Sequence, residues 1–455
     1  MADKKKEKSV AGELKESLFS SPKKGIVTAD EQTVKAADDF ANGYKTFLNN
    51  SKIEREAVNY TLTLAKQAGF VEYDPSKKYN PGDKIYAINR NKAIALAVIG
   101  TNGVKNGANL AIAHIDCPRI DLKPNPVYEN SNLCLFKTHY YGGIKKYQWT
   151  AIPLSLHGRV AKTDGTFADV NIGDNDDDPC FTITDLLPHL SSEQAVKTVA
   201  KAIDGEDLNV LIGSRPYNSD DDSEQVKLNI LSILNKQYGI TEDDFLSAEL
   251  SLTPAFKAKD VGFDRSMIGG YGHDDRVCAY PSIMAVLDAK SPQKTAITYL
   301  CDKEEIGSMG NTGMQSDFLK YFIFELAKKE GLDEYSVISK CKCLSADVNA
   351  AFDPTYASAY EARNSSYINN GVTIMKYAGH GGKAGTSDAS AEFMGEIRSL
   401  LIKNNVIWQA GELGRVDLGG GGTISSYIAN WNVDVVDIGV PVLSMHAPFE
   451  VVSKL

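Results

Sequence analysis

The stretch NLAIAHIDCP, residues 109–118, passes directly from an apolar run into polar residues. The run Leu110–Ala113 has the length of a buried strand, and His114 and Asp116 follow it. Three more apolar runs end in polar residues: Ala296–Cys301 before Asp302, Glu304 and Glu305; Cys343–Ala346 before Asp347; and Val440–Met445 before His446. Because ligands of open α/β sheets gather beyond the carboxyl ends of the strands, we expect these side chains to converge on one crevice.

Helical periodicity marks the segments between these strands, at Val34–Ala68, Val277–Ala289 and Phe318–Lys329. Strands that alternate with helices predict an α/β fold with a mixed, largely parallel sheet flanked by helices. Residues 122–254 differ, because they combine apolar patches with turn signals and acidic loops. We therefore expect one domain from residues 1–121 and 255–455, interrupted by an inserted domain of residues 122–254.

Length, composition and charge limit the classes of function. A chain of 455 residues is long for one core, and 43% hydrophobic with 24% charged residues is ordinary for a folded, soluble protein. The net charge of -10 argues against nucleic acid and anionic membranes as partners. The basic run at Lys4–Lys8 is expected to be a solvated tail.

The expected compartment is the cytoplasm. The first ten residues lack the apolar stretch of a secretory signal, and no run of about eighteen apolar residues occurs in the chain. Seven scattered cysteines do not form a disulfide framework, and Cys341 and Cys343 are expected to be core thiols.

The ligand types at the strand ends predict a metal site. Imidazole and carboxylate without thiolate suit zinc, manganese or cobalt. Two histidines and three carboxylates exceed the needs of one catalytic zinc, which indicates two ions that share a carboxylate. Two such ions activate a bridging water and polarise a carbonyl group, while a nearby carboxylate moves the proton.

Four other features carry no chemistry on their own. The stretch GHGGKAG, residues 379–385, is not a phosphate loop, because Tyr377 and Ala384 stand where Gly and Ser or Thr are required. The acidic loops at 174–178 and 220–222 lack the ligand spacing of an EF-hand. The run Gly419–Gly422 indicates close backbone approach near the active site, and His157 is expected to be structural.

Five motifs together resemble the aspartyl aminopeptidase family of metallopeptidases, and its bacterial branch in particular. They are, in chain order, AHIDCPRIDLKP, GGYGHDDRVCAY, CDKEEIGSMGNTGMQS, SADVNAAFDP and GVPVLSMHAPFE. The resemblance extends from about Ile53 to the end of the chain. It implies a catalytic α/β domain, an inserted mainly-β dimerisation domain and assembly into a tetrahedral dodecamer.

The resemblance also implies roles for individual residues. His114 and Asp347 correspond to ligands of one metal ion, and Glu305 and His446 to ligands of the other. Asp274, the first residue of the pair Asp274–Asp275, corresponds to the bridging ligand. The general base and the residue that orients His114 correspond to Glu304 and Asp116 respectively.

Substrate-side residues follow the family less closely. Lys376 corresponds to a lysine that faces an acidic substrate side chain, and His189 to a histidine that completes a neighbouring subunit's active site. These residues imply hydrolysis of N-terminal Asp or Glu. Asn349 and Asp353 depart from the histidines of the eukaryotic pattern, which leaves open a broad-specificity aminopeptidase, or an amidase, with neutral-residue preference. A catalytically silent assembly protein is the alternative from another class.

Overall fold

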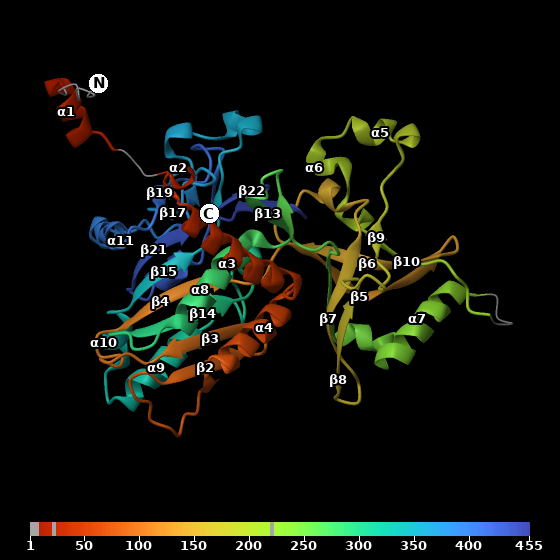
Figure 1. The fold of residues 1–455 in the computed structure, drawn as a ribbon. Coiled ribbons are helices and arrows are strands. Elements are labelled where there is room, and N and C mark those ends of the chain that lie inside the picture. The colour runs from red at the N-terminus through yellow and green to blue at the C-terminus, as the bar shows by residue number, and fades with distance from the viewer. Residues whose placement is uncertain (1–8, 21–23, 219–222) are drawn as a thin grey trace.

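The structure is a computed structural model that describes residues 9–20, 24–218 and 223–455. Figure 1 shows a larger body built around a broad sheet, and beside it a smaller body that contains β5–β10 and helix α7 (Gln225–Tyr238). The chain begins in the larger body, forms the smaller body as one continuous insertion, and then returns to the larger body. The basic run Lys4–Lys8 and the acidic loop 220–222 lie outside the described residues.

A nine-stranded mixed sheet forms the centre of the larger body, in the order β1-β2-β3-β14-β4-β15-β21-β17-β19. Its strands are β1 (Val71–Glu72), β2 (Lys84–Asn89), β3 (Ala93–Val98), β4 (Ala108–His114), β14 (Thr295–Cys301), β15 (Lys342–Ala346), β17 (Val372–Met375), β19 (Trp408–Ala410) and β21 (Asp434–Gly439). The central strands β14, β4, β15 and β21 are parallel, whereas β2–β3, β3–β14 and β17–β21 are antiparallel pairs. The predicted fold class is confirmed.

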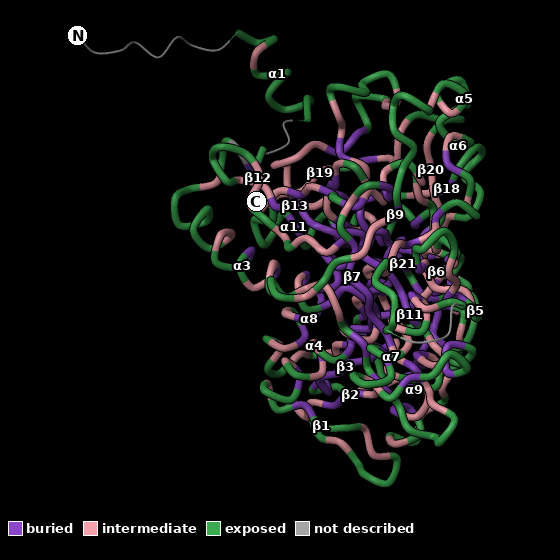
Figure 2. The backbone as a smooth tube through the Cα atoms, turned by 90° about the vertical axis from the view of Figure 1, so that its right-hand side faces the viewer, coloured by how far each residue is buried: buried purple, intermediate pink, exposed green. Residues whose placement is uncertain are grey.

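Helices cover both faces of this sheet, and the strand β3 shows why. Ile94, Leu96 and Val98 pack into one apolar cluster, and the alternate alanines of β3 pack into another. The first cluster is covered by α3 (Glu31–Asn49), α4 (Glu54–Gln67) and α8 (His273–Asp288). The second is covered by α9 (Phe318–Lys329), α10 (Glu334–Ile338) and α12 (Ser425–Ala429), and α11 (Ala391–Lys403) packs beside β21. Buried residues therefore concentrate in the strands, while α1 (Val10–Leu18) has none (Figure 2).

Two elements differ from their sequence prediction. The helix expected at Val34–Ala68 is two helices, α3 and α4, because the chain turns at residues 50–53 and Lys52 there donates to the carbonyl groups of Pro254 and Phe256. The run Val440–Met445 is not a strand of the main sheet. The strand of the main sheet in this region is β21. Its polar residues made it difficult to recognise in the sequence, since Asp437 is buried and accepts the Thr423 hydroxyl at 2.9 Å.

The smaller body contains a seven-stranded antiparallel sheet, ordered β8-β7-β11-β5-β6-β10-β9. Its strands are β5 (Arg119–Asn130), β6 (Leu133–Tyr141), β7 (Leu154–Ala161), β8 (Phe167–Ile172), β9 (Thr182–Ile183), β10 (Val210–Gly213) and β11 (Ala248–Pro254). Helix α7 and the buried Trp149 contribute to its own apolar core. Strand β5 begins at Arg119, and the domain boundaries at 121/122 and 254/255 stay a prediction.

A third sheet lies between the two bodies, ordered β12-β13-β23-β22-β16 (Figure 1). Its strands are β12 (Lys259–Val261), β13 (Met267–Gly270), β16 (Asn349–Ala350), β22 (Pro441–Leu443) and β23 (Glu450–Ser453). The loop between β22 and β23 carries His446. Cys341 and Cys343 are buried in the core of the larger body, as expected. Among the described helices, none has both the length and the apolar character needed to cross a membrane.

Candidate metal centre

The carboxyl ends of the central parallel strands position most of the predicted ligands. His114 is the last residue of β4 and is paired with Cys301, the last residue of β14. Asp347 follows β15, the other neighbour of β4, and Glu304 and Glu305 lie in the turn η5 (Glu304–Ile306) after β14. Because the strands are parallel and in register, their ends meet at one edge of the sheet.

Asp274 and His446 reach the same place from other elements. Asp274 lies in the first turn of α8, and His446 lies in the loop of the third sheet. The Asp274 Oδ1 atom is 3.1 Å from His114 Nε2, and its Oδ2 atom is 3.1 Å from His446 Nε2. One carboxylate therefore stands between two imidazoles, with one oxygen toward each.

Further carboxylates surround each imidazole. Asp347 Oδ1 and Glu304 Oε2 lie 3.8 and 3.9 Å from His114 Nε2, and Glu305 Oε2 lies 3.5 Å from His446 Nε2. Within the described chain, three groups of side chains place ligand atoms within 4.8 Å of one another. These groups are His114 with Asp275 and Asp347, His114 with Glu304 and Glu305, and Asp274 with Glu305 and His446.

The chemistry of this cluster fits divalent cations. Both oxygens of Asp275 and Oε1 of Glu305 are buried and have no hydrogen-bond partner among the residues that the structure describes. An unpaired buried carboxylate is costly, and a coordinated cation removes that cost. Nitrogen and oxygen donors without thiolate match zinc, manganese or cobalt and not a structural cysteine site. The residues present therefore fit a dinuclear site.

The electrostatics of the carboxyl groups lead to the same conclusion. Burial raises the pKa of Glu304 to about 8, and Asp347 adds to this increase, while His114 opposes it. Burial also raises the pKa values of Glu305 and Asp275 well above their usual range. For Asp274 the effect of burial is outweighed by its hydrogen bonds with His114 and His446, which hold its pKa below the usual range. Crowded carboxyl groups of this kind are stabilised as anions by a cation.

Both histidines are oriented through their second nitrogen. His114 Nδ1 lies 3.0 Å from the carbonyl oxygen of Asp116 and 3.3 Å from Oδ1 of the same residue. His446 Nδ1 lies 2.8 Å from the carbonyl oxygen of Gly143. An Nδ1–H that donates to these oxygens leaves the Nε2 lone pair facing the cluster.

Asp116 also fixes the turn that carries the paired glutamates. Its carboxylate is fully buried and accepts the backbone N–H groups of Glu304 and Glu305 at 3.1 and 3.2 Å. The Tyr141 hydroxyl donates to Asp116 Oδ2 at 2.8 Å. Asp116 thus contacts both His114 and the glutamate turn.

A cavity of about 480 Å³ opens onto the cluster. Asp274, Glu304, Glu305, Asp347 and His446 line one part of it. The rest is lined by small or apolar residues, with hydroxyl side chains and Tyr427: Gly143, Gly307, Ser308, Val348, Met375, Ala378, Gly385, Leu413, Gly420, Gly421, Gly422, Thr423, Ser426, Tyr427 and Met445. Most of the run Gly419–Gly422 therefore lies at the site, and no lysine or arginine is among these lining residues.

The two predicted substrate-side residues are not brought to this cavity. Lys376 follows Met375, which does line the cavity, but its Nζ forms an ion pair with Asp388 at 2.6 Å. His189 is exposed in the short helix η2 (Pro188–Leu190) of the smaller body. Asp353 caps a short helix by accepting the Thr355 N–H at 2.9 Å.

Two residues of the site are not predicted by the sequence patterns. The resemblance assigns the bridging role to Asp274 and gives Asp275 no role, yet Asp275 is fully buried beside His114 and Asp347. Glu450 is buried at the start of β23 and accepts the backbone N–H groups of Asp274 and His446 at 3.1 and 2.7 Å. The sequence feature that could have indicated Glu450 is a charged residue directly before the apolar pair Val451 and Val452.

Comparison with known proteins identifies the family. The family model described as aminopeptidase I zinc metalloprotease (M18) matches residues 47–455. The chain belongs to the M18 family of zinc aminopeptidases. The resemblance noted in the motifs is thereby confirmed, with a match that begins slightly before Ile53.

Individual members of the M18 family are similar to this chain over nearly its whole length. A probable M18 family aminopeptidase 1 of Clostridium acetobutylicum is 46% identical over 433 residues, which cover 93% of each protein. The crystal structure of an M18 aminopeptidase from Thermotoga maritima has a TM-score of 0.90 and 42% identity, and 96% of each chain is covered. The structure of the S. cerevisiae mApe1 dodecamer is 19% identical, with a TM-score of 0.75 over 93% of this chain and 94% of that one, and shows the shared fold alone.

Proposed function

We propose that this M18 enzyme removes the N-terminal residue of peptides with two divalent metal ions bound per chain, zinc in the first place, with manganese or cobalt as alternatives. The observation that carries the proposal is the position of Asp274, whose two oxygens each lie 3.1 Å from the Nε2 atom of a different histidine. A carboxylate in that position is suited to bridging two ions.

Each ion has its own set of ligands in this proposal. His114 and Asp347 would hold one ion, Glu305 and His446 would hold the other, and Asp274 would be shared between them. Asp275, whose ligand atom lies within 4.8 Å of those of His114 and Asp347, would be a further ligand for the first ion. Asp116 orients His114 and the turn of Glu304 and Glu305.

The ions would acidify a water molecule and polarise the scissile carbonyl group. Glu304 lines the cavity and lies near the imidazole of His114. We assign it as the general base that takes a proton from the attacking water and passes it to the leaving amine. The carboxylates around it give the free ammonium group of the substrate an acidic environment.

Peptides with free and acetylated N-termini test this function. The zinc-loaded protein is expected to release one residue from the free peptide and none from the acetylated one, as followed by mass spectrometry. Equal release from both would show an amidase instead. No release from either peptide, with zinc bound, would favour the catalytically silent assembly protein.

The side-chain preference is proposed separately. Lys376 suggested N-terminal Asp or Glu, but its ammonium group is already paired with Asp388. Met375, Leu413 and Met445 give the cavity an apolar part. These contacts favour the neutral-residue alternative, because an acidic side chain placed there lacks a cationic partner.

We predict faster hydrolysis of N-terminal Leu than of Asp or Glu, by about tenfold or more in kcat/KM. Leaving a buried charged group unpaired costs more than about 1–3 kcal/mol, and about 1.4 kcal/mol corresponds to tenfold in rate. Lys376→Met and its control Lys383→Met, which removes the second lysine beside Asp388, are expected to give the same preference as the wild type. Faster cleavage of Asp or Glu that is lost only in Lys376→Met would restore the acidic prediction.

We also propose a homo-oligomer, and a tetrahedral dodecamer in particular. The smaller body exposes an apolar group at 186–199, formed by Leu186, Leu187, Leu190, Val196 and Val199. Exposed groups of this kind are typical of surfaces that pair with another chain. The mApe1 relative is described as a dodecamer. A cytoplasmic location and the absence of nucleic-acid or membrane partners stay predictions.

Light scattering tests the assembly. We expect a mass of about twelve times the 49.5 kDa of one chain. If His189 completes a neighbouring active site, His189→Ala lowers kcat and leaves that mass unchanged. A fully active monomer at nanomolar concentration would contradict both the assembly and this role of His189.

A further inference from the structure

Three consecutive residues of the smaller body contact the metal centre of the larger one. Tyr141 is the last residue of β6, and Gly142 and Gly143 follow it. The Tyr141 hydroxyl donates to Asp116 Oδ2 at 2.8 Å, and the Gly143 carbonyl oxygen accepts from His446 Nδ1 at 2.8 Å. We call these three residues the 141–143 segment.

Gly142 lies against Glu305, a proposed metal ligand, and its lack of a side chain leaves space for the Glu305 side chain. Its φ is +76°, and a Cβ atom built on it would lie 3.3 Å from both Cβ and Oε2 of Glu305. Any larger residue would press on the Glu305 side chain while also being strained in its backbone. The 141–143 segment therefore contacts one residue of the glutamate turn and one of the two histidines, besides Asp116.

Asp116 extends the influence of Tyr141 to the rest of the site. The Asp116 carboxylate accepts the N–H groups of Glu304 and Glu305 and lies against His114 Nδ1. Burial and the nearby Asp116 raise the pKa of Tyr141 well above its usual range, so its hydroxyl remains a donor. Loss of the Tyr141 hydroxyl would remove a hydrogen bond to Asp116 Oδ2 and leave the carboxylate less firmly oriented.

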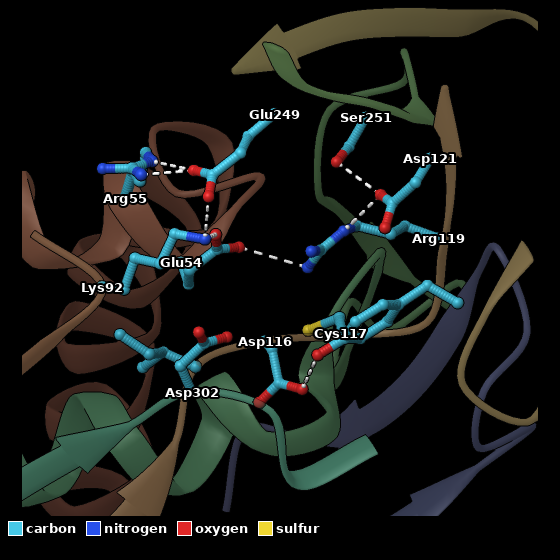
Figure 3. Close-up of polar contacts among 12 residues, drawn as sticks. Glu54, Arg55, Lys92, Asp116, Cys117, Arg119, Asp121, Glu249, Ser251 and Asp302 are labelled. Carbon is cyan, nitrogen blue, oxygen red and sulfur yellow. Dashed lines mark hydrogen bonds and ion pairs between the residues drawn. The ribbon is translucent and has the colours of Figure 1, made fainter. Parts of the chain in front are cut away.

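The ring of Tyr141 is held in turn by Arg119. The Arg119 guanidinium lies 4.0 Å from the centre of the ring. Its Nη1 atom forms an ion pair with Glu54 of α4 at 3.1 Å, and its Nε atom forms one with Asp121 of β5 at 2.8 Å (Figure 3). Asp121 also accepts the Ser251 hydroxyl.

A second set of ion pairs connects the larger and smaller bodies near Arg119. Glu249 of β11 binds Lys92 at 2.7 Å and also Arg55, so that strands of the smaller body are tied to the larger one beside Arg119 (Figure 3). The position of the Tyr141 ring is thus set by contacts from both bodies.

We propose that the 141–143 segment positions the metal centre, so that the seven-stranded sheet of the same chain is needed for tight metal binding. This inference rests on the proposed two-ion site. It assigns Tyr141, Gly142 and Gly143 a positioning role through Asp116, Glu305 and His446. A purely structural role, in which they only join the two bodies, would affect the stability of the fold and leave zinc affinity unchanged.

Tyr141→Phe tests the hydroxyl contact. It keeps the ring on Arg119 and removes only the donor to Asp116, and Tyr140→Phe is the matched control because Tyr140 is exposed on the same strand. We expect Tyr141→Phe to lose about 10- to 100-fold in zinc affinity or kcat, with KM little changed, as found for partners that orient metal ligands. Zinc affinity is measured by competition with a chromophoric chelator.

Gly142→Ala tests the packing contact against Gly165→Ala. Gly165 lies between β7 and β8 with φ +82°. Apart from its two chain neighbours, no described residue has an atom within 4 Å of the position that an added Cβ would take, so its substitution carries mainly backbone strain. We expect Gly142→Ala to weaken zinc binding by about tenfold or more, and Gly165→Ala to bind zinc as the wild type does.

The outcomes separate the positioning role from the proposed function. Zinc affinity and kcat of Tyr141→Phe and Gly142→Ala within twofold of their controls would overturn the positioning role, whatever their melting temperatures. A wild type that binds zinc but releases no amino acid would contradict the proposed function, while the chelator competition would still decide the role of the segment.

Discussion

Glu304→Gln is expected to lower kcat by about 10²–10⁴-fold while both metal ions stay bound. Glutamine keeps the size of the side chain but cannot accept the proton of the attacking water. Glu304 Oε2 lies 3.9 Å from His114 Nε2, whereas Glu305 Oε2 lies 3.5 Å from His446 Nε2, and the other Glu305 oxygen is buried with no partner in the described part of the chain. The measurement is kcat on an N-terminal Leu peptide together with the zinc content of the same sample.

The neighbouring residue supplies the control for that substitution. Glu305→Gln is expected to weaken zinc binding and to recover part of its activity at high zinc concentration, because it removes a ligand and not the base. If Glu304→Gln lost zinc and Glu305→Gln kept it, the roles assigned to the two glutamates would be reversed.

His446→Ala is expected to lose one metal ion and nearly all activity. The Nε2 atom of His446 faces both Asp274 and Glu305, and without it that ion has only carboxylate ligands from the chain. Zinc content by elemental analysis and kcat are measured in parallel. His139→Ala is the control, because His139 is exposed on β6 and its ring contacts the adjacent Tyr140. Full activity with unchanged zinc content would remove His446 from the site.

The sequence was sufficient to predict where the ligands converge, and the register of the strands explains why. His114, Asp347 and the glutamate turn follow β4, β15 and β14, which are adjacent and parallel. In such a sheet, an apolar run that ends in a ligand residue marks both the strand and the edge at which it ends. The residue order alone therefore predicted their meeting.

Other features depend on contacts between distant parts of the chain. His446 follows β22 of a different sheet, so the prediction that it follows a strand of the main sheet was wrong. The polar residues of β21 concealed that strand in the sequence, because Asp437 is fully buried and accepts the Thr423 hydroxyl. Helix periodicity likewise continued across the turn between α3 and α4, because both helices bury an apolar face in one core.

The residues that contact the substrate side chain were hardest to predict, because the sequence does not show which charged side chains form ion pairs with each other. The sequence shows Lys376 only as a cation, whereas in the structure it pairs with Asp388, which Lys383 also contacts, and it does not line the cavity. Tyr141 and Gly143 carried no local signal, because their contacts with Asp116 and His446 join two bodies of the structure. Such contacts arise from the arrangement of the sheets and not from neighbouring residues.

Activity measured against bound zinc tests the central claim most directly. Metal-free protein is titrated with zinc, and the zinc bound per chain and the release of N-terminal Leu are measured in each sample. The dinuclear site predicts little activity without zinc and full activity only at two ions per chain. Full activity in the metal-free protein, or full activity at one ion with no second ion bound, would contradict it.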